Sequence, residues 1–182
     1  MSILTQTPTG VIPSGTWAID PSHSTVEFTV KHLGLATVRG RALDVTGTIV
    51  GGDDPSIEGS VRVAGITTFD ETRDGHLQSP DFFDGARHPE LLFRSRSVEL
   101  HGDELVVEGD LTIKGVTKPA TLEGTITGPA VDHFGATRVG FKLETVIDRR
   151  EFDINWNMPL PSGEPALSND VTLKADLTLV GA

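Results

Sequence analysis

TVEFTVKH, residues 25–32, alternates strictly between polar and apolar side chains. Successive side chains of a β-strand point to opposite faces of its sheet, so this alternation predicts a strand with one buried face. The same period of two recurs over residues 43–49, 57–66, 91–100, 104–113, 117–126, 138–147 and 171–180. The sequence therefore predicts an all-β protein of about eight strands.

The connections between these stretches indicate how the strands are arranged. Turn-forming residues separate most of them, as in Gly51-Gly52-Asp53-Asp54-Pro55. Long strands joined by short turns favour an extended, eight-stranded antiparallel up-and-down barrel over a Greek-key sandwich. The interior of such a barrel is either packed with side chains or able to hold one ligand, and the alternation is compatible with both.

Two stretches lack the alternation. Residues 71–86 have room for one or two helical turns, so we expect a short helical segment there, and residues 158–165 form a Pro-rich loop. Each is either a lid over a barrel end or a plain connection. In the first stretch we expect Asp74 to cap the following turn and Arg73 to pair with a nearby carboxylate.

The chain reads as one folding unit. No Gly/Ser/Pro-rich linker divides its 182 residues, so we expect a single domain over residues 16–182 after a mobile lead, residues 1–15. The lead carries no Lys or Arg and no apolar run of signal-peptide length. We therefore expect a cytoplasmic protein without a signal peptide.

Charge and hydropathy exclude several partners. The formal net charge is −11, whereas phosphate backbones are bound by basic patches, so we expect no nucleic-acid partner. Nowhere do eighteen consecutive apolar residues occur, so we expect no transmembrane segment.

The residues that carry chemistry form no recognisable catalytic or metal motif. There is no cysteine, and the six histidines lie in separate segments with no His-x-His or His-Glu-x-x-His spacing, at positions 23, 32, 76, 88, 101 and 133. A Gly-x-Ser-x-Gly elbow is absent as well. We expect no catalytic residues, no metal site and no required cofactor. His32 shares the apolar phase of its strand and is either a hydrogen-bonded core residue or a polar contact for a ligand.

Four segments, in order, resemble a known family. They are WAIDPSHS at 17–24, RDGHLQSPDFF at 73–83, GDLTIKGVTKP at 109–119 and REFD at 150–153. From about Thr16 to Val180 the chain resembles the YceI-like, lipocalin-like family of polyisoprenoid-binding proteins. The resemblance implies an eight-stranded barrel whose pore holds a long isoprenoid chain, no catalytic activity and frequently a homodimer. Many relatives are periplasmic and carry a signal peptide.

The resemblance and the inward phase of the strands together predict the ligand site. An isoprenoid lipid, such as a prenyl quinone or a polyprenol, is expected to contact seven apolar side chains, Phe28, Val30, Val45, Leu111, Phe141, Leu143 and Leu173. Its polar end is expected near His32, Arg73 and His76. Trp17 is expected to plug one barrel end. Two alternatives are a metal-assisted hydrolase or isomerase that uses the same barrel, and a filled-barrel stress protein that binds nothing.

Overall fold

A computed structural model describes residues 12–182, and every strand in it belongs to one antiparallel sheet. The strands are β1 (Gly15–Ile19), β2 (Thr25–His32), β3 (Ala36–Ala42), β4 (Val45–Gly51), β5 (Ser56–Arg62), β6 (Ile66–Thr67), β7 (Glu90–His101), β8 (Glu104–Ile113), β9 (Val116–Val131), β10 (Thr137–Asp148) and β11 (Leu167–Gly181). The helices are α1 (Glu71–Gln78) and three short 3-10 turns, η1 (Pro21–His23), η2 (Val63–Gly65) and η3 (Arg149–Phe152).

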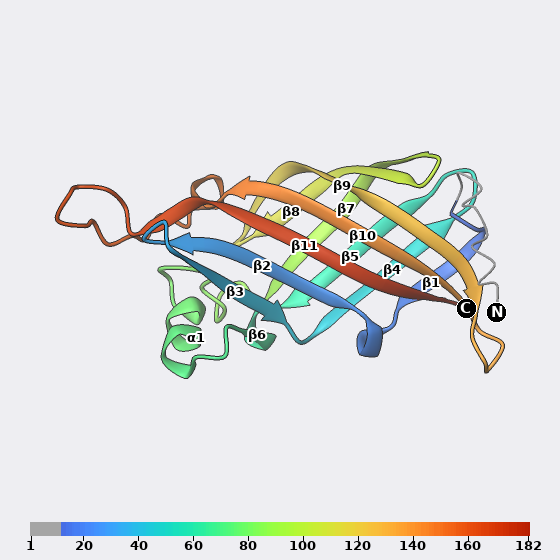
Figure 1. The fold of residues 1–182 in the computed structure, drawn as a ribbon, viewed down its shortest axis with the longest axis horizontal. Coiled ribbons are helices and arrows are strands. Elements are labelled where there is room, and N and C mark those ends of the chain that lie inside the picture. The colour runs from blue at the N-terminus through green and yellow to red at the C-terminus, as the bar shows by residue number, and fades with distance from the viewer. Residues whose placement is uncertain (1–11) are drawn as a thin grey trace.

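The sheet closes into a barrel. Eight strands form the ring in the order β1, β4, β5, β7, β8, β9, β10 and β11, and β11 pairs back onto β1. β1 pairs with the C-terminal end of β11, and β2 pairs with its N-terminal part. There β2, β3 and β6 extend the wall of the barrel. In Figure 1 the long strands run across the molecule, with α1 at one end and the end of β11 at the other. The predicted eight-stranded antiparallel barrel is confirmed.

Some strand boundaries differ from the prediction. The expected strand 57–66 is interrupted by η2, and the sequence pattern missed β1 and β3. β3 was missed because its inward residues other than Val38 are small, such as Gly40 and Ala42. The aromatic ring of Phe28 lies over Gly40, where an added Cβ would come within 2.0 Å of the ring. Small inward residues carry little apolar signal, although they form a regular strand.

The expected helical segment is shorter than residues 71–86. Asp70 caps the N-terminus of α1 by accepting a hydrogen bond from the Arg73 backbone N–H (2.9 Å). The helix ends at Gln78 because Ser79 precedes Pro80, and a residue before proline disfavours the helical backbone. The chain then continues in turns until β7.

The barrel interior is packed at the end away from α1. Buried side chains from most of the ring strands meet there, among them Ile12, Trp17, Ile49, Leu105, Phe141 and Leu179. Trp17 is 4% exposed and its indole N–H donates to the Pro13 carbonyl (2.9 Å), so it plugs this end as expected. Residues 1–11 of the expected mobile lead lie outside the described residues, whereas Ile12 is fully buried in the packed end.

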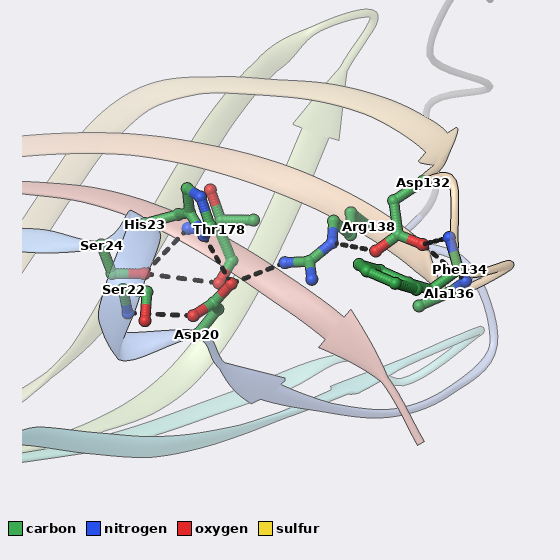
Figure 2. A network of polar contacts seen from close by, with 9 residues as sticks. All are labelled: Asp20, Ser22, His23, Ser24, Asp132, Phe134, Ala136, Arg138 and Thr178. Atoms are coloured by element: carbon green, nitrogen blue, oxygen red, sulfur yellow. Dashed lines mark hydrogen bonds and ion pairs between the residues drawn. The ribbon is translucent and has the colours of Figure 1, made fainter.

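A polar network fastens the outside of the packed end (Figure 2). The Arg138 guanidinium lies between two carboxylates, Asp20 (2.6 Å) and Asp132 (2.7 Å), and His23 Nδ1 lies 2.8 Å from the same Asp20 oxygen. The hydrogen bonds from His23 and Arg138 lower the pKa of Asp20 to about 2. The network thereby ties the β1–β2 junction to the β9–β10 hairpin.

Candidate functional site

The half of the barrel nearer α1 is hollow. A cavity of about 460 Å³ runs from the edge of the packed end to the mouth beside α1, a volume typical of small-molecule sites. Aliphatic and aromatic side chains from β2 to β5, β7, β8, β10 and β11 form most of its wall. The inward phase of the strands therefore encloses a lumen in this half and a packed core in the other.

Nine of the ten predicted ligand contacts lie on the cavity wall. They are Phe28, Val30, His32, Val45, Arg73, His76, Leu111, Leu143 and Leu173. His32 is exposed at the mouth, so the core interpretation of this histidine is wrong.

Phe141 is a correction to the predicted set. It faces inward, as expected, but its cross-strand neighbours are Ile126 and Leu177, and its side chain is fully buried in the packed end. At this level of the barrel, side chains fill the interior. The alternation identified the correct face of β10 but carried no information on the position along the barrel axis.

α1 is held at the mouth by Asp74. This carboxylate accepts hydrogen bonds from the Thr68 backbone N–H (2.7 Å), the Thr68 hydroxyl (2.6 Å) and the Thr67 hydroxyl (2.7 Å). Burial opposes its ionisation, but the hydrogen bonds outweigh burial and hold the pKa of Asp74 below its usual range. The expectation that Asp74 caps the following turn is wrong, since Asp70 is the N-cap and Asp74 anchors the helix to the chain that precedes it.

Arg73 is also placed differently from the expectation. Its Nε donates to the Thr68 hydroxyl (2.8 Å) and its Nη2 to the Thr68 carbonyl (3.1 Å). Within residues 12–182 it makes no ion pair with a carboxylate. Arg73 is exposed at the mouth while lining the cavity, so it offers a cation to whatever occupies the opening.

His76 lies in an aromatic group at the mouth. Its ring contacts Trp156 and Phe82 edge-on, with centroids 4.8 and 4.9 Å away, and its Nε2 lies 2.8 Å from the Asp81 carboxylate. All three rings line the cavity. Phe83 adds a further ring, which meets Phe28 edge-on at 6.2 Å. Aromatic side chains thus narrow the opening beside α1.

Arg149 supports the other side of the mouth. Its guanidinium donates to four backbone carbonyls, those of Ser168 (2.9 Å), Ile154 (3.0 Å), Trp156 (2.7 Å) and Leu167 (3.4 Å). The side chain is 4% exposed, and this burial lowers its pKa. Arg149 therefore holds the ends of the loop between η3 and β11, including the backbone that carries the Trp156 ring.

Sequence reasoning missed several mouth residues. Arg149 was not among the predicted ligand contacts, and neither was the neighbouring Arg150, which forms an ion pair with Asp148 (2.6 Å). Trp156 gave no periodic signal because it lies outside the strands. Its one available signal was its residue type, since a tryptophan beside a Pro-rich loop near the predicted lid is a plausible ligand contact.

Within residues 12–182 no three His, Asp or Glu side chains converge where a metal ion could bind. Over the same residues the structure contains no helix with the length and apolar content required to cross a bilayer.

Comparison with known proteins identifies relatives of the chain. A family model, the YceI-like domain, matches residues 17–179. Protein YceI of Escherichia coli O157:H7 is 38% identical over 146 residues, which cover 78% of this chain and 76% of that protein. The chain belongs to the YceI-like family. The resemblance of its four sequence segments is thereby confirmed.

Solved structures share the YceI-like barrel. BcnA of Burkholderia cenocepacia superposes with a TM-score of 0.74 at 19% identity, over 88% of this chain and 98% of BcnA. A polyisoprenoid binding domain from Saccharophagus degradans superposes with a TM-score of 0.68 at 12% identity, over 91% of this chain and 98% of that domain. At these identities the two structures show a common fold.

Proposed function

We propose that this protein is a non-catalytic carrier that holds a long-chain polyisoprenoid, a prenyl quinone or a polyprenol, in the barrel cavity. The observation that carries the proposal is the apolar lumen of about 460 Å³, which opens beside α1. The fold that this chain shares with the polyisoprenoid binding domain of Saccharophagus degradans supports the same ligand class. A filled barrel without ligand is disfavoured by the lumen.

The cavity suits a flexible hydrocarbon better than a polar substrate. Its deep wall is aliphatic, with Ile49, Ile57 and Leu177 near the packed end. Each CH₂ group transferred from water to such a wall contributes roughly 0.8 kcal/mol before ordering costs. The cationic and imidazole groups of the lining that lie at the opening include Arg73 and His76, so we place the ligand's polar end near these two residues.

An enzyme remains the second candidate because of one observation. The His76 ring and the Asp81 carboxylate form a pair at the mouth, and a His–carboxylate pair is a common acid–base arrangement. We favour binding because the groups that pack against the His76 ring are the aromatic rings of Phe82 and Trp156. The hydroxyl of Ser79 donates to the His76 backbone carbonyl (2.6 Å) and not to the ring. Turnover of a prenyl substrate that disappears in a His76→Ala variant would contradict the proposal.

The ligand class is tested by what the protein carries. Protein isolated from its native host without detergent is extracted with organic solvent, and the extract is analysed by mass spectrometry. We expect a prenyl lipid in near-stoichiometric amount, and apo protein should bind added solanesol, a nine-unit polyprenol. A protein that carries no lipid and does not bind solanesol would refute the proposal.

The oligomeric state and the cellular location stay predictions. We propose a homodimer, which light scattering of the purified protein tests. The expected cytoplasmic location is tested by fractionation of native cells, with recovery in the envelope fraction as the contrary result.

A further inference from the structure

We propose that the α1 end of the barrel docks onto a phospholipid bilayer through a ring of exposed apolar side chains around the cavity mouth. This inference rests on the proposed carrier function. The ring, here called the mouth rim, consists of Leu33, Leu35, Phe69 and Met158. Their exposed fractions are 43%, 83%, 79% and 61%.

The mouth rim is continuous with the cavity wall. Leu33 directly follows His32, and Phe69 directly follows Thr68, and both of these neighbours line the cavity. Figure 1 shows the β2–β3 turn, α1 and the loop before β11 at the same end of the barrel. An acyl or prenyl chain that leaves the cavity therefore meets apolar side chains at its exit.

Hydrogen bonds hold two parts of the rim next to each other. The Leu33 backbone N–H donates to the Ala166 carbonyl (2.7 Å), and the Ala166 N–H donates to the Met158 carbonyl (3.2 Å). The β2–β3 turn and the Pro-rich loop thus form one connected edge of the mouth. Phe69 lies on a separate segment, beside α1.

Two rim residues have a backbone conformation that is unfavourable for large side chains. Leu33 has φ 57° and Phe69 has φ 60°, in the left-handed region that disfavours bulky side chains. Burial of the side chain does not compensate for this backbone conformation, because both side chains are exposed. Strained backbone together with grouped apolar exposure is characteristic of binding surfaces.

The shape and charge of the rim favour a bilayer over a second copy of the chain. Its members lie on separate segments around an opening, and a second copy placed there would seal the route by which a lipid enters. Exposed charges near the rim are mixed, with Lys31 and Arg73 against three acidic side chains, Asp70, Glu71 and Glu164, so there is no basic patch for anionic lipid. We therefore infer apolar insertion into a zwitterionic surface, which high salt does not abolish.

Vesicle flotation tests the rim. The probe is a phosphatidylcholine vesicle, and the variant combines Leu35→Ser, Phe69→Asn and Met158→Ser, with Asn chosen because it tolerates a positive φ. Loss of three large apolar contacts should reduce vesicle partitioning by at least about tenfold. The matched control is Phe134→Ser on the β9–β10 hairpin at the opposite end, where Phe134 is 85% exposed, and it should float like the unmodified protein.

The two tryptophans report the orientation. Trp156 lines the cavity mouth, and Trp17 is buried at the packed end. Vesicles of phosphatidylcholine with brominated acyl chains should quench the fluorescence of Trp156 only, so quenching should disappear in Trp156→Phe. Equal quenching of the Trp17 emission that remains would overturn the inference.

A solution assay separates the failure of this inference from the failure of the proposed function. The triple variant should still bind solanesol in the absence of vesicles. In sedimentation it should show the same oligomeric state as the unmodified protein. If the unmodified protein binds solanesol but does not float, docking is refuted and the carrier stands. If it does not bind solanesol, the carrier is refuted. A triple variant with a lower oligomeric state assigns the rim to a contact between copies and also refutes docking.

Discussion

Arg149 is a buried cation whose hydrogen-bond partners are backbone carbonyls. Four such oxygens receive its N–H groups, and they belong to the loop that carries Trp156 and to the start of β11. A planar guanidinium presents several donors in fixed directions, which a lysine ammonium cannot reproduce. One side chain thus organises a segment that lacks regular secondary structure.

Replacement Arg149→Lys should keep the charge and lose this geometry. Carbonyls left without a donor in a buried site are costly, and we expect a loss of about 2–3 kcal/mol in the free energy of unfolding. Chemical denaturation measures it. Arg150→Lys, in the exposed neighbour, is the control and should have a much smaller effect. Equal stability of Arg149→Lys and the unmodified protein would show that the guanidinium geometry is dispensable.

Asp20 should make stability sensitive to acid. Its pKa in the folded protein is about 2, below the ordinary value of 3.8, so the unfolded chain binds more protons between these values. The stabilisation is complete above about pH 4 and is lost as pH falls through 2. Asp20→Asn should lower stability by about 1 kcal/mol at neutral pH and flatten the decline between pH 4 and 2.

Urea unfolding at a series of pH values measures this dependence. Asp54→Asn, which removes an exposed carboxylate on the β4–β5 turn, controls for the change in net charge. If the free energy of unfolding of Asp20→Asn falls between pH 4 and 2 as steeply as that of the unmodified protein, other carboxylates dominate acid unfolding.

At the scale of elements, α1 is attached to the barrel by few contacts. It has one buried residue, Leu77, and its chief polar anchor is Asp74, which joins it to Thr67 and Thr68. An element held by few buried contacts opens more readily than the strands around it. α1 therefore has the attachment expected of a lid.

Asp74→Asn should loosen α1 without unfolding the barrel. An amide keeps one acceptor but points a donor at hydroxyls that were donating, so the anchor weakens. We expect about tenfold faster hydrogen exchange of the α1 amides, equivalent to about 1.4 kcal/mol. Glu71→Gln, on the same helix, should leave exchange unchanged. If exchange in α1 stays the same in Asp74→Asn, the helix is held by packing instead.

Sequence patterns predicted strands well where inward residues are large. β2 was predicted at its observed bounds, Thr25–His32, and β8 at Glu104–Ile113, because each alternates polar with bulky apolar residues. β3 was missed because glycine and alanine occupy most of its inward positions. The mouth was predicted incompletely because Arg149 and Trp156 act through backbone contacts and position, which leave no periodic pattern in the sequence.

At the scale of the whole molecule, the barrel is divided along its axis. One end is filled around Trp17 and Phe141, and the other encloses the cavity. The filled end contributes the hydrophobic burial that stabilises the fold, so the hollow end need not be tightly packed. This division allows an apolar lumen to persist without collapse.

Filling the lumen should therefore abolish binding and leave the fold intact. Gly59 lies on β5 between the inward Ile57 and Val61, and an added Cβ there would be 3.8 Å from the nearest atom, the Thr46 carbonyl oxygen. Gly59→Phe should lower solanesol binding by at least about tenfold with little loss of stability. Thr46→Phe places the same ring on the exposed face of β4 and should bind normally. Unchanged binding in Gly59→Phe would place the ligand elsewhere.

The pairing of β1 with β11 has a consequence for how the protein is made. Trp17 pairs with Gly181, residues near opposite ends of the described chain. During synthesis the ribosome releases β1 long before β11, so β1 waits for this partner until β11 emerges. Until then the ring is open along its whole length, with unpaired edges exposed to other chains. Translation speed and chaperone access while β11 is being synthesised should therefore influence the yield of the protein more strongly than they do for folds built from local contacts.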